Sequence, residues 1–123
     1  MKLMTKAIER QMPALYATEG VALADKVARV KFFTPWSGWT WYGIEYDPQK
    51  RMFFGLVDSG ADKEFGYFSL DELMAIRGPY GWGIERDLHF GARRLGDMSI
   101  MQRRIQSEAN KALLREYREA IGN

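Results

Sequence analysis

Two neighbouring segments rich in aromatic and β-branched residues constrain the fold of this chain more than any other feature. Residues 39–47 are Trp-Thr-Trp-Tyr-Gly-Ile-Glu-Tyr-Asp, residues 51–58 are Arg-Met-Phe-Phe-Gly-Leu-Val-Asp, and the turn sequence Asp47-Pro48-Gln49-Lys50 joins them. Such side chains suit a pleated sheet, and a short proline-containing turn reverses the chain. The sequence therefore predicts an antiparallel hairpin. Because residues 51–58 place apolar side chains on both faces, we expect helices to cover both sides of the sheet, at least in part.

Three further segments carry strand signals. Residues 27–33 predict a strand that ends at Thr34-Pro35, because proline cannot donate a backbone hydrogen bond to a sheet. Residues 64–69 predict a short strand after the hairpin, and residues 84–90 predict a last one.

Helix signals occur at three places. Apolar residues at helical spacing follow Thr5, which can cap a helix, and Pro13 ends or kinks that helix. Ser69 and Glu72 form a capping box, in which the hydroxyl and the carboxylate satisfy each other's free backbone amides, so a short helix begins there. Apolar residues over 98–121 form one stripe, which predicts a long amphipathic helix from Ser99.

Together these signals predict an α+β domain over residues 1–95. We expect a mostly antiparallel sheet of four to five strands, an N-terminal helix and a short central helix. Residues 96–123 are expected to form the long C-terminal helix, which packs either on this domain or, through residues 98–121, on a second copy in a homodimer.

Composition excludes several classes of protein. The chain has 123 residues and no cysteine, so it fits one domain without disulfides or thiolate metal ligands. No apolar run approaches the roughly 18 residues of a membrane span, and the charged N-terminus lacks a signal-peptide core, so we expect a cytoplasmic protein with no membrane contact. Residues 93–123 carry seven basic and four acidic side chains. This excess of positive charge is only a weak indication of nucleic-acid binding.

The only histidine lies in the run Gly83-Ile-Glu-Arg-Asp-Leu-His-Phe90. On a strand, Glu85, Asp87 and His89 would share one face. Carboxylate oxygens and imidazole are metal ligands, so these three residues are candidate metal-binding and catalytic residues. The alternative is a polar strand face turned to solvent. With one histidine and no cysteine, the usual nucleophile triads are all but excluded.

Arg86 falls on the apolar face of the same predicted strand. A guanidinium there is costly unless it is bonded to a carboxylate or to carbonyls. Strand register offers three partners for an ion pair, namely Glu45, Asp58 and Glu64. The alternative is that Arg86 binds an anion.

The aromatic residues around the glycine-rich loops are candidate recognition residues. Most tryptophans and tyrosines fit core packing, but Trp36 and Trp82 lie in glycine-flanked loops where burial is harder to achieve, and Tyr80 is in the same loop as Trp82. Residues 78–83 lack the Lys-Ser/Thr of a phosphate-binding loop and the spacing of a dinucleotide fingerprint. We therefore assign Trp36, Tyr80, Trp82 and Arg86 as candidate binding residues.

Five stretches of the chain resemble one known family. They are Thr5-Lys6 with Leu15-Tyr-Ala-Thr18, Val30-Lys-Phe-Phe-Thr-Pro35 with Trp39-Thr-Trp-Tyr42, Phe54-Gly-Leu-Val57, Gly66-Tyr-Phe-Ser-Leu-Asp-Glu-Leu73 and Ile84-Glu-Arg-Asp-Leu-His-Phe90. In this order, over about residues 3–92, they resemble the bacterial family catalogued as domain of unknown function 2958. The resemblance implies a small protein typical of plasmids and other mobile elements, without an established activity. It also implies that tyrosine can replace His89, which argues against an obligatory catalytic histidine. The tail from about Gly96 lies outside the resemblance.

Two functions follow from these observations. The first is a non-enzymatic binding or accessory protein of a bacterial mobile element, which contacts a protein or nucleic-acid partner through the loops around Trp36 and Trp82. The sequence does not specify a cofactor, and none is required for such a role. The alternative is a metal-dependent hydrolase or nuclease that uses Glu85, Asp87 and His89. The sequence leaves open whether the protein is an enzyme.

Overall fold

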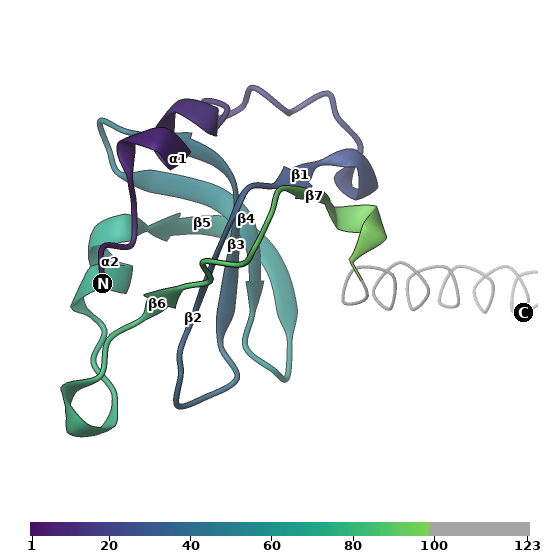
Figure 1. The fold of residues 1–123 in the computed structure, drawn as a ribbon. Helices are drawn as coiled ribbons and strands as arrows, with labels where there is room; N and C mark the ends of the chain where they lie inside the picture. Colours follow the sequence, from purple (N-terminus) through teal and green to yellow (C-terminus); the bar gives the residue numbers. More distant parts are fainter. Residues whose placement is uncertain (99–123) are drawn as a thin grey trace, which may run out of the picture.

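The computed structural model describes residues 1–98, which form two antiparallel sheets and two short α-helices (Figure 1). The main sheet has five strands in the order β5-β4-β3-β2-β6, and a second sheet pairs β1 with β7. The strands are β1 (Val27–Ala28), β2 (Val30–Phe33), β3 (Thr40–Asp47), β4 (Met52–Asp58), β5 (Lys63–Ser69), β6 (Glu85–Arg86) and β7 (Arg93–Arg94). The α-helices are α1 (Lys6–Gln11) and α2 (Leu70–Ala75), and three 3-10 turns are η1 (Leu23–Asp25), η2 (Pro79–Gly81) and η3 (Leu95–Asp97).

The predicted hairpin is confirmed as β3 and β4. Its register pairs Trp41 with Val57 and Asp47 with Met52 across an antiparallel ladder. The Asp47 carboxylate accepts the backbone N–H of Gln49 at 2.9 Å, which stabilises the turn.

A β-bulge in β3 changes which side chains face which side of the sheet. The register with β4 shifts by one residue between Gly43 and Glu45. Tyr42 and Ile44 pack on one face, and strict alternation would place Tyr46 with them, yet Tyr46 packs on the opposite face. The buried Glu45 side chain is likewise turned away from the first core, toward the segment that contains Tyr16 and Thr18.

The buried Glu45 carboxylate fastens the segment before β1 onto the sheet. It accepts the backbone N–H groups of Tyr16 at 2.8 Å and Thr18 at 3.1 Å, and also the Thr18 hydroxyl. The buried Lys26 ammonium donates in turn to Thr18 Oγ1 at 3.0 Å and to the Thr18 carbonyl. Each buried charge thus has hydrogen-bond partners, as burial of a charge requires.

Each face of the main sheet has its own core. The first core lies under α1 and α2 and is formed by Leu3, Val30, Phe32, Trp41, Tyr46, Phe53, Phe68, Leu70, Leu73 and Ile84. The second core lies under β1 and η3 and is formed by Ala28, Tyr42, Ile44, Leu56, Leu95 and Met98. Figure 1 shows α1 and α2 on one side of the fold and the β1–β7 pair with η3 on the other.

Both short helices begin where their caps predict. Thr5 accepts the N–H of Ile8 at 3.2 Å, and α1 ends at Gln11, before Pro13. Ser69 likewise accepts the N–H of Glu72 at 3.2 Å at the start of α2.

The predicted α+β architecture is wrong in several respects. The α-helices are only six residues long, and strands and 3-10 turns rather than helices cover the second core. The strand predicted over residues 27–33 is interrupted at Arg29, because β1 leaves the main sheet to pair with β7. The long C-terminal helix predicted from Ser99 falls outside the described residues. The proposed domain boundary at residue 95 remains a prediction, although Leu95 and Met98 are both buried in the second core.

Within residues 1–98, no helix is long and apolar enough to cross a membrane.

The close approach of β3 to β4 beside the bulge makes a stability prediction. A Cβ on Gly55 would lie 1.8 Å from the backbone oxygen of Tyr42. We predict that Gly55→Ala lowers the free energy of unfolding by about 3 kcal/mol, measured by urea denaturation, because backbone cannot yield as a side chain can.

Gly66 is the matched control, because it lies directly opposite Gly55 in β5 and a Cβ added to it would meet no atom within 4 Å. Gly66→Ala should change stability by no more than about 0.5 kcal/mol. Equal effects of the two substitutions would contradict this description of the bulge.

Candidate binding site around strand β6

Strand β6 forms one edge of the main sheet and is only two residues long. It pairs with β2 at Phe32–Arg86 and Phe33–Glu85. The chain then turns, with the Asp87 carboxylate accepting the N–H of His89 at 2.9 Å and the Asp87 carbonyl accepting that of Phe90 at 3.3 Å. The predicted strand over residues 84–90 therefore ends early, and His89 does not continue the alternation of Glu85 and Asp87.

Glu85, Asp87 and His89 border one hollow without forming a metal site. Among residues 1–98, no group of three or more histidine, aspartate or glutamate side chains could hold a metal ion. One Asp87 oxygen is used in the turn, and the other lies 3.6 Å from the Lys31 ammonium. The three candidates thus share a neighbourhood, but their geometry gives the metal hypothesis no support.

Arg86 binds carbonyls rather than a carboxylate. Its Nη1 donates to the backbone oxygens of Lys2 at 2.7 Å and Leu3 at 2.9 Å. The predicted ion pair is wrong, since no ion pair among residues 1–98 includes Arg86. Strand order explains the error: β6 and β5, which carries Glu64, lie at opposite edges of the sheet.

The loop between α2 and β6 presents two aromatic side chains to solvent. Tyr80 is 94% exposed and Trp82 is 54% exposed, with their ring centroids 6.2 Å apart. The loop is closed at its base, where Arg77 and Gly83 form a β-bridge and the Gly78 N–H donates to the Trp82 carbonyl at 2.7 Å. Figure 1 shows this green segment extending beyond the sheet.

Trp36 supports this loop from inside. A Cβ on Gly78 would lie 2.3 Å from the indole ring, so the ring packs directly against the glycine backbone. Trp36 is partly buried against the first core. Only Trp82 of the two candidate tryptophans is thus exposed, and Trp36 positions the loop that carries it.

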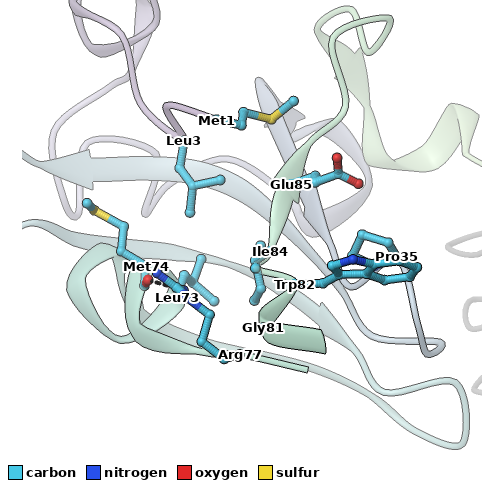
Figure 2. A pocket seen from close by; sticks show the side chains of 11 residues that line it. Met1, Leu3, Pro35, Leu73, Met74, Arg77, Gly81, Trp82, Ile84 and Glu85 are labelled. Atoms are coloured by element: carbon cyan, nitrogen blue, oxygen red, sulfur yellow. Dashed lines mark hydrogen bonds between the residues drawn. The ribbon is translucent and has the colours of Figure 1, made fainter. Parts of the chain in front are cut away.

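A cleft of about 580 Å³ lies between this loop and the segment before α1; we call it the first cleft. It is lined by Met1, Leu3, Pro35, Leu73, Met74, Arg77, Gly81, Trp82, Gly83, Ile84 and Glu85. Figure 2 shows Leu3 and Met74 on one side of the hollow and Trp82 and Glu85 on the other. Arg77 is engaged at the end of α2, where its Nη1 donates to the carbonyls of Met74 at 2.7 Å and Ile76 at 2.8 Å.

A second cleft of about 460 Å³ lies on the other side of β6. It is lined by Met1, Lys31, Phe33, Thr34, Ser37, Gly38, Trp39, Thr40, Glu85, Arg86, Asp87, Leu88 and His89. Its character is mixed, with Trp39 stacked on Trp41 at 5.7 Å and Lys31 placed over the Tyr42 ring at 5.9 Å. Burial raises the pKa of the Tyr42 hydroxyl, and the charges of Asp58 and Asp87 raise it further.

Residues 3–108 match the family described as Protein of unknown function (DUF2958). The chain belongs to the DUF2958 family. The match extends past residue 92, where the resemblance was expected to end, and it includes residues 96–108 of the tail. No curated protein and no solved structure matches the chain significantly.

Sequence reasoning missed two residues of this DUF2958 site. Met1 lines both clefts, and its sulfur accepts the backbone N–H of Arg86 at 3.1 Å. Lys31 pairs with Asp87 across the second cleft. Arg86 on an apolar face did signal a buried hydrogen-bond partner, but nothing in the sequence indicated that the partner would come from residues 2 and 3.

The contact between Arg86 and the segment before α1 makes a second stability prediction. Arg86→Ala removes two charge-assisted hydrogen bonds, so it should lower the free energy of unfolding by about 2 kcal/mol in urea denaturation. Lys2→Ala is the control, because it removes a neighbouring charge and keeps the Lys2 carbonyl; we expect a change within about 0.5 kcal/mol. A fully stable Arg86→Ala protein would show that this contact does not hold the segment.

Proposed function

We propose that this DUF2958 protein is a non-enzymatic binding module that recognises a protein partner through the loop over residues 77–83 and the first cleft. The observation that carries this proposal is the pair of exposed aromatic rings, Tyr80 and Trp82, on a closed loop that borders a hollow lined by both apolar and charged side chains. Tyrosine and tryptophan dominate the binding energy of many protein interfaces.

The backbone of the loop supports this proposal. Tyr80 has φ of +59°, a left-handed conformation that costs a non-glycine residue roughly 1–2 kcal/mol. Its side chain is almost fully exposed, so packing within the chain does not return this cost. Strain at an exposed aromatic residue is typical of a recognition site. Because the loop is held at its base, little further entropy is lost when a partner binds.

The charges near the loop favour a protein partner over nucleic acid. Proteins that stack bases on aromatic rings interleave those rings with basic residues that contact phosphates. Here Arg77 donates to the carbonyls of Met74 and Ile76 at the end of α2, and Glu85 adds a negative charge to the first cleft.

Three other expectations from the sequence are the role in a mobile element, the homodimer and the metal-dependent enzyme. A role in a bacterial mobile element rests on the family resemblance alone, and the homodimer through residues 98–121 concerns residues outside those described. Because Glu85, Asp87 and His89 form no metal-holding group among residues 1–98, we do not propose a metal-dependent hydrolase or nuclease.

Photo-crosslinking in cells of the organism that encodes this protein tests the proposal. With benzoylphenylalanine in place of Tyr80, we expect one discrete protein adduct, and we expect Trp82→Ala to reduce its yield about tenfold or more, as loss of an interface hot spot does. Benzoylphenylalanine at Gln49, an exposed turn residue on the β3–β4 hairpin, is the control. The same adducts from both positions would contradict a specific site.

A titration with single-stranded oligothymidine at low salt tests whether the partner is instead a nucleic acid. Tryptophan fluorescence should stay flat, because Arg77, the basic side chain of the loop, already donates to the carbonyls of Met74 and Ile76. A saturable quench of the fluorescence that disappears in Trp82→Phe would contradict the proposed protein partner and indicate that the loop binds nucleic acid.

A further inference from the structure

The outer edge of β6, where residues 1–3 lie, has a backbone donor that faces away from the sheet. The Asp87 N–H donates to the Lys31 carbonyl at 2.9 Å, so Asp87 directs its backbone groups toward β2. Backbone groups alternate in direction along an antiparallel strand, and the N–H of the preceding residue, Arg86, therefore points outward. There it meets only the sulfur of Met1, at 3.1 Å.

The hydrogen bond between the Arg86 N–H and the Met1 sulfur is weak. A thioether sulfur is a poor hydrogen-bond acceptor compared with a backbone carbonyl. The Met1 side chain is also 68% exposed, so moving it away uncovers little apolar surface. A peptide carbonyl could therefore replace the sulfur at Arg86.

The two clefts border β6, where the side chains of a strand added at this edge could reach them. Met1 and Glu85 line both clefts, which open on opposite sides of β6. Side chains of a strand alternate between the two faces of its sheet. Successive residues of an added strand would thus enter the first cleft and the second cleft in turn.

We propose that the edge of β6 binds an extended segment of the protein partner by β-strand addition, with Met1 displaced. Leu3, Leu73 and Ile84 make the first cleft suitable for an apolar side chain. In the second cleft the paired Lys31 and Asp87 offer both a donor and an acceptor, which suits a neutral polar side chain. The partner segment therefore alternates apolar and neutral polar residues. This inference rests on the proposed function, because both use the first cleft.

A displayed library of random 12-residue peptides, selected against the full chain, provides the probe. Enriched sequences should alternate apolar and neutral polar residues. When a synthetic peptide of such a sequence is added, the amide resonance of Arg86 should be among those that move most. Two N-methylated versions of the peptide are then compared, one methylated at its odd-numbered amides and one at its even-numbered amides. One version should bind at least about tenfold more weakly and the other should bind almost normally, because only alternate amides of a strand face its neighbour.

Met1→Ala, made in a chain released from a cleavable fusion, removes the internal competitor. It should bind the same peptide several-fold more tightly, whereas Gln11→Ala, an exposed substitution on α1, should not change the affinity. A variant with unchanged affinity would contradict displacement of Met1.

Two outcomes would overturn strand addition and leave the proposed function standing. The first is a peptide that binds without moving the Arg86 resonance, or whose N-methylation shows no alternation. The second is no enrichment on either the unmodified chain or Met1→Ala while the Tyr80 crosslink still forms. Loss of the Tyr80 crosslink, with peptide binding at β6 retained, would instead overturn the role of the loop alone.

Discussion

The buried Glu45 carboxylate at the β3 bulge is the interaction on which the rest of the structure depends. A regular strand would direct this residue toward the apolar side chains of the first core. The one-residue register shift after Gly43 instead turns it toward the segment at Tyr16 and Thr18. A buried carboxylate without such donors would cost several kcal/mol, so the bulge and the segment require each other.

That attachment determines how the two faces of the sheet are covered. The Tyr46 N–H donates to the Pro13 carbonyl at 2.8 Å, which adds a backbone contact just past the bulge. With residues 13–18 held there, α1 lies over the first core, and residues 1–3 reach the edge at β6. Arg86 then binds those residues through their carbonyls. The candidate site thus joins residues 1–3 to the segment over residues 73–89, although its centre is a strand of two residues.

Local signals in the sequence predicted the elements whose cause is local. The β3–β4 hairpin follows from side-chain types and an Asp-Pro turn, and the starts of α1 and α2 follow from the hydroxyl caps Thr5 and Ser69. Tyr80 and Trp82 were assigned as candidate binding residues because glycine flanked them, and the structure places both in solvent.

The remaining features depend on contacts that are distant in sequence. Nothing local indicates that Val27 pairs with Arg94, or that residues 1–3 lie at the edge of β6. Trp36 resembled Trp82 in its loop setting, yet its ring has the backbone of Gly78 to pack on, more than forty positions along the chain. The predicted Arg86 ion pair failed because an arginine on an apolar face specifies an acceptor without specifying a carboxylate.

The central claim is that the edge of β6 is held weakly enough to accept another strand. Amide hydrogen exchange in the free protein tests it most directly, because it compares two adjacent groups in one molecule. The Asp87 amide, bonded to the Lys31 carbonyl, should be protected at least about tenfold more than the Arg86 amide, which meets only the Met1 sulfur. Equal protection of the two amides would show that the edge is already closed, and it would contradict the account.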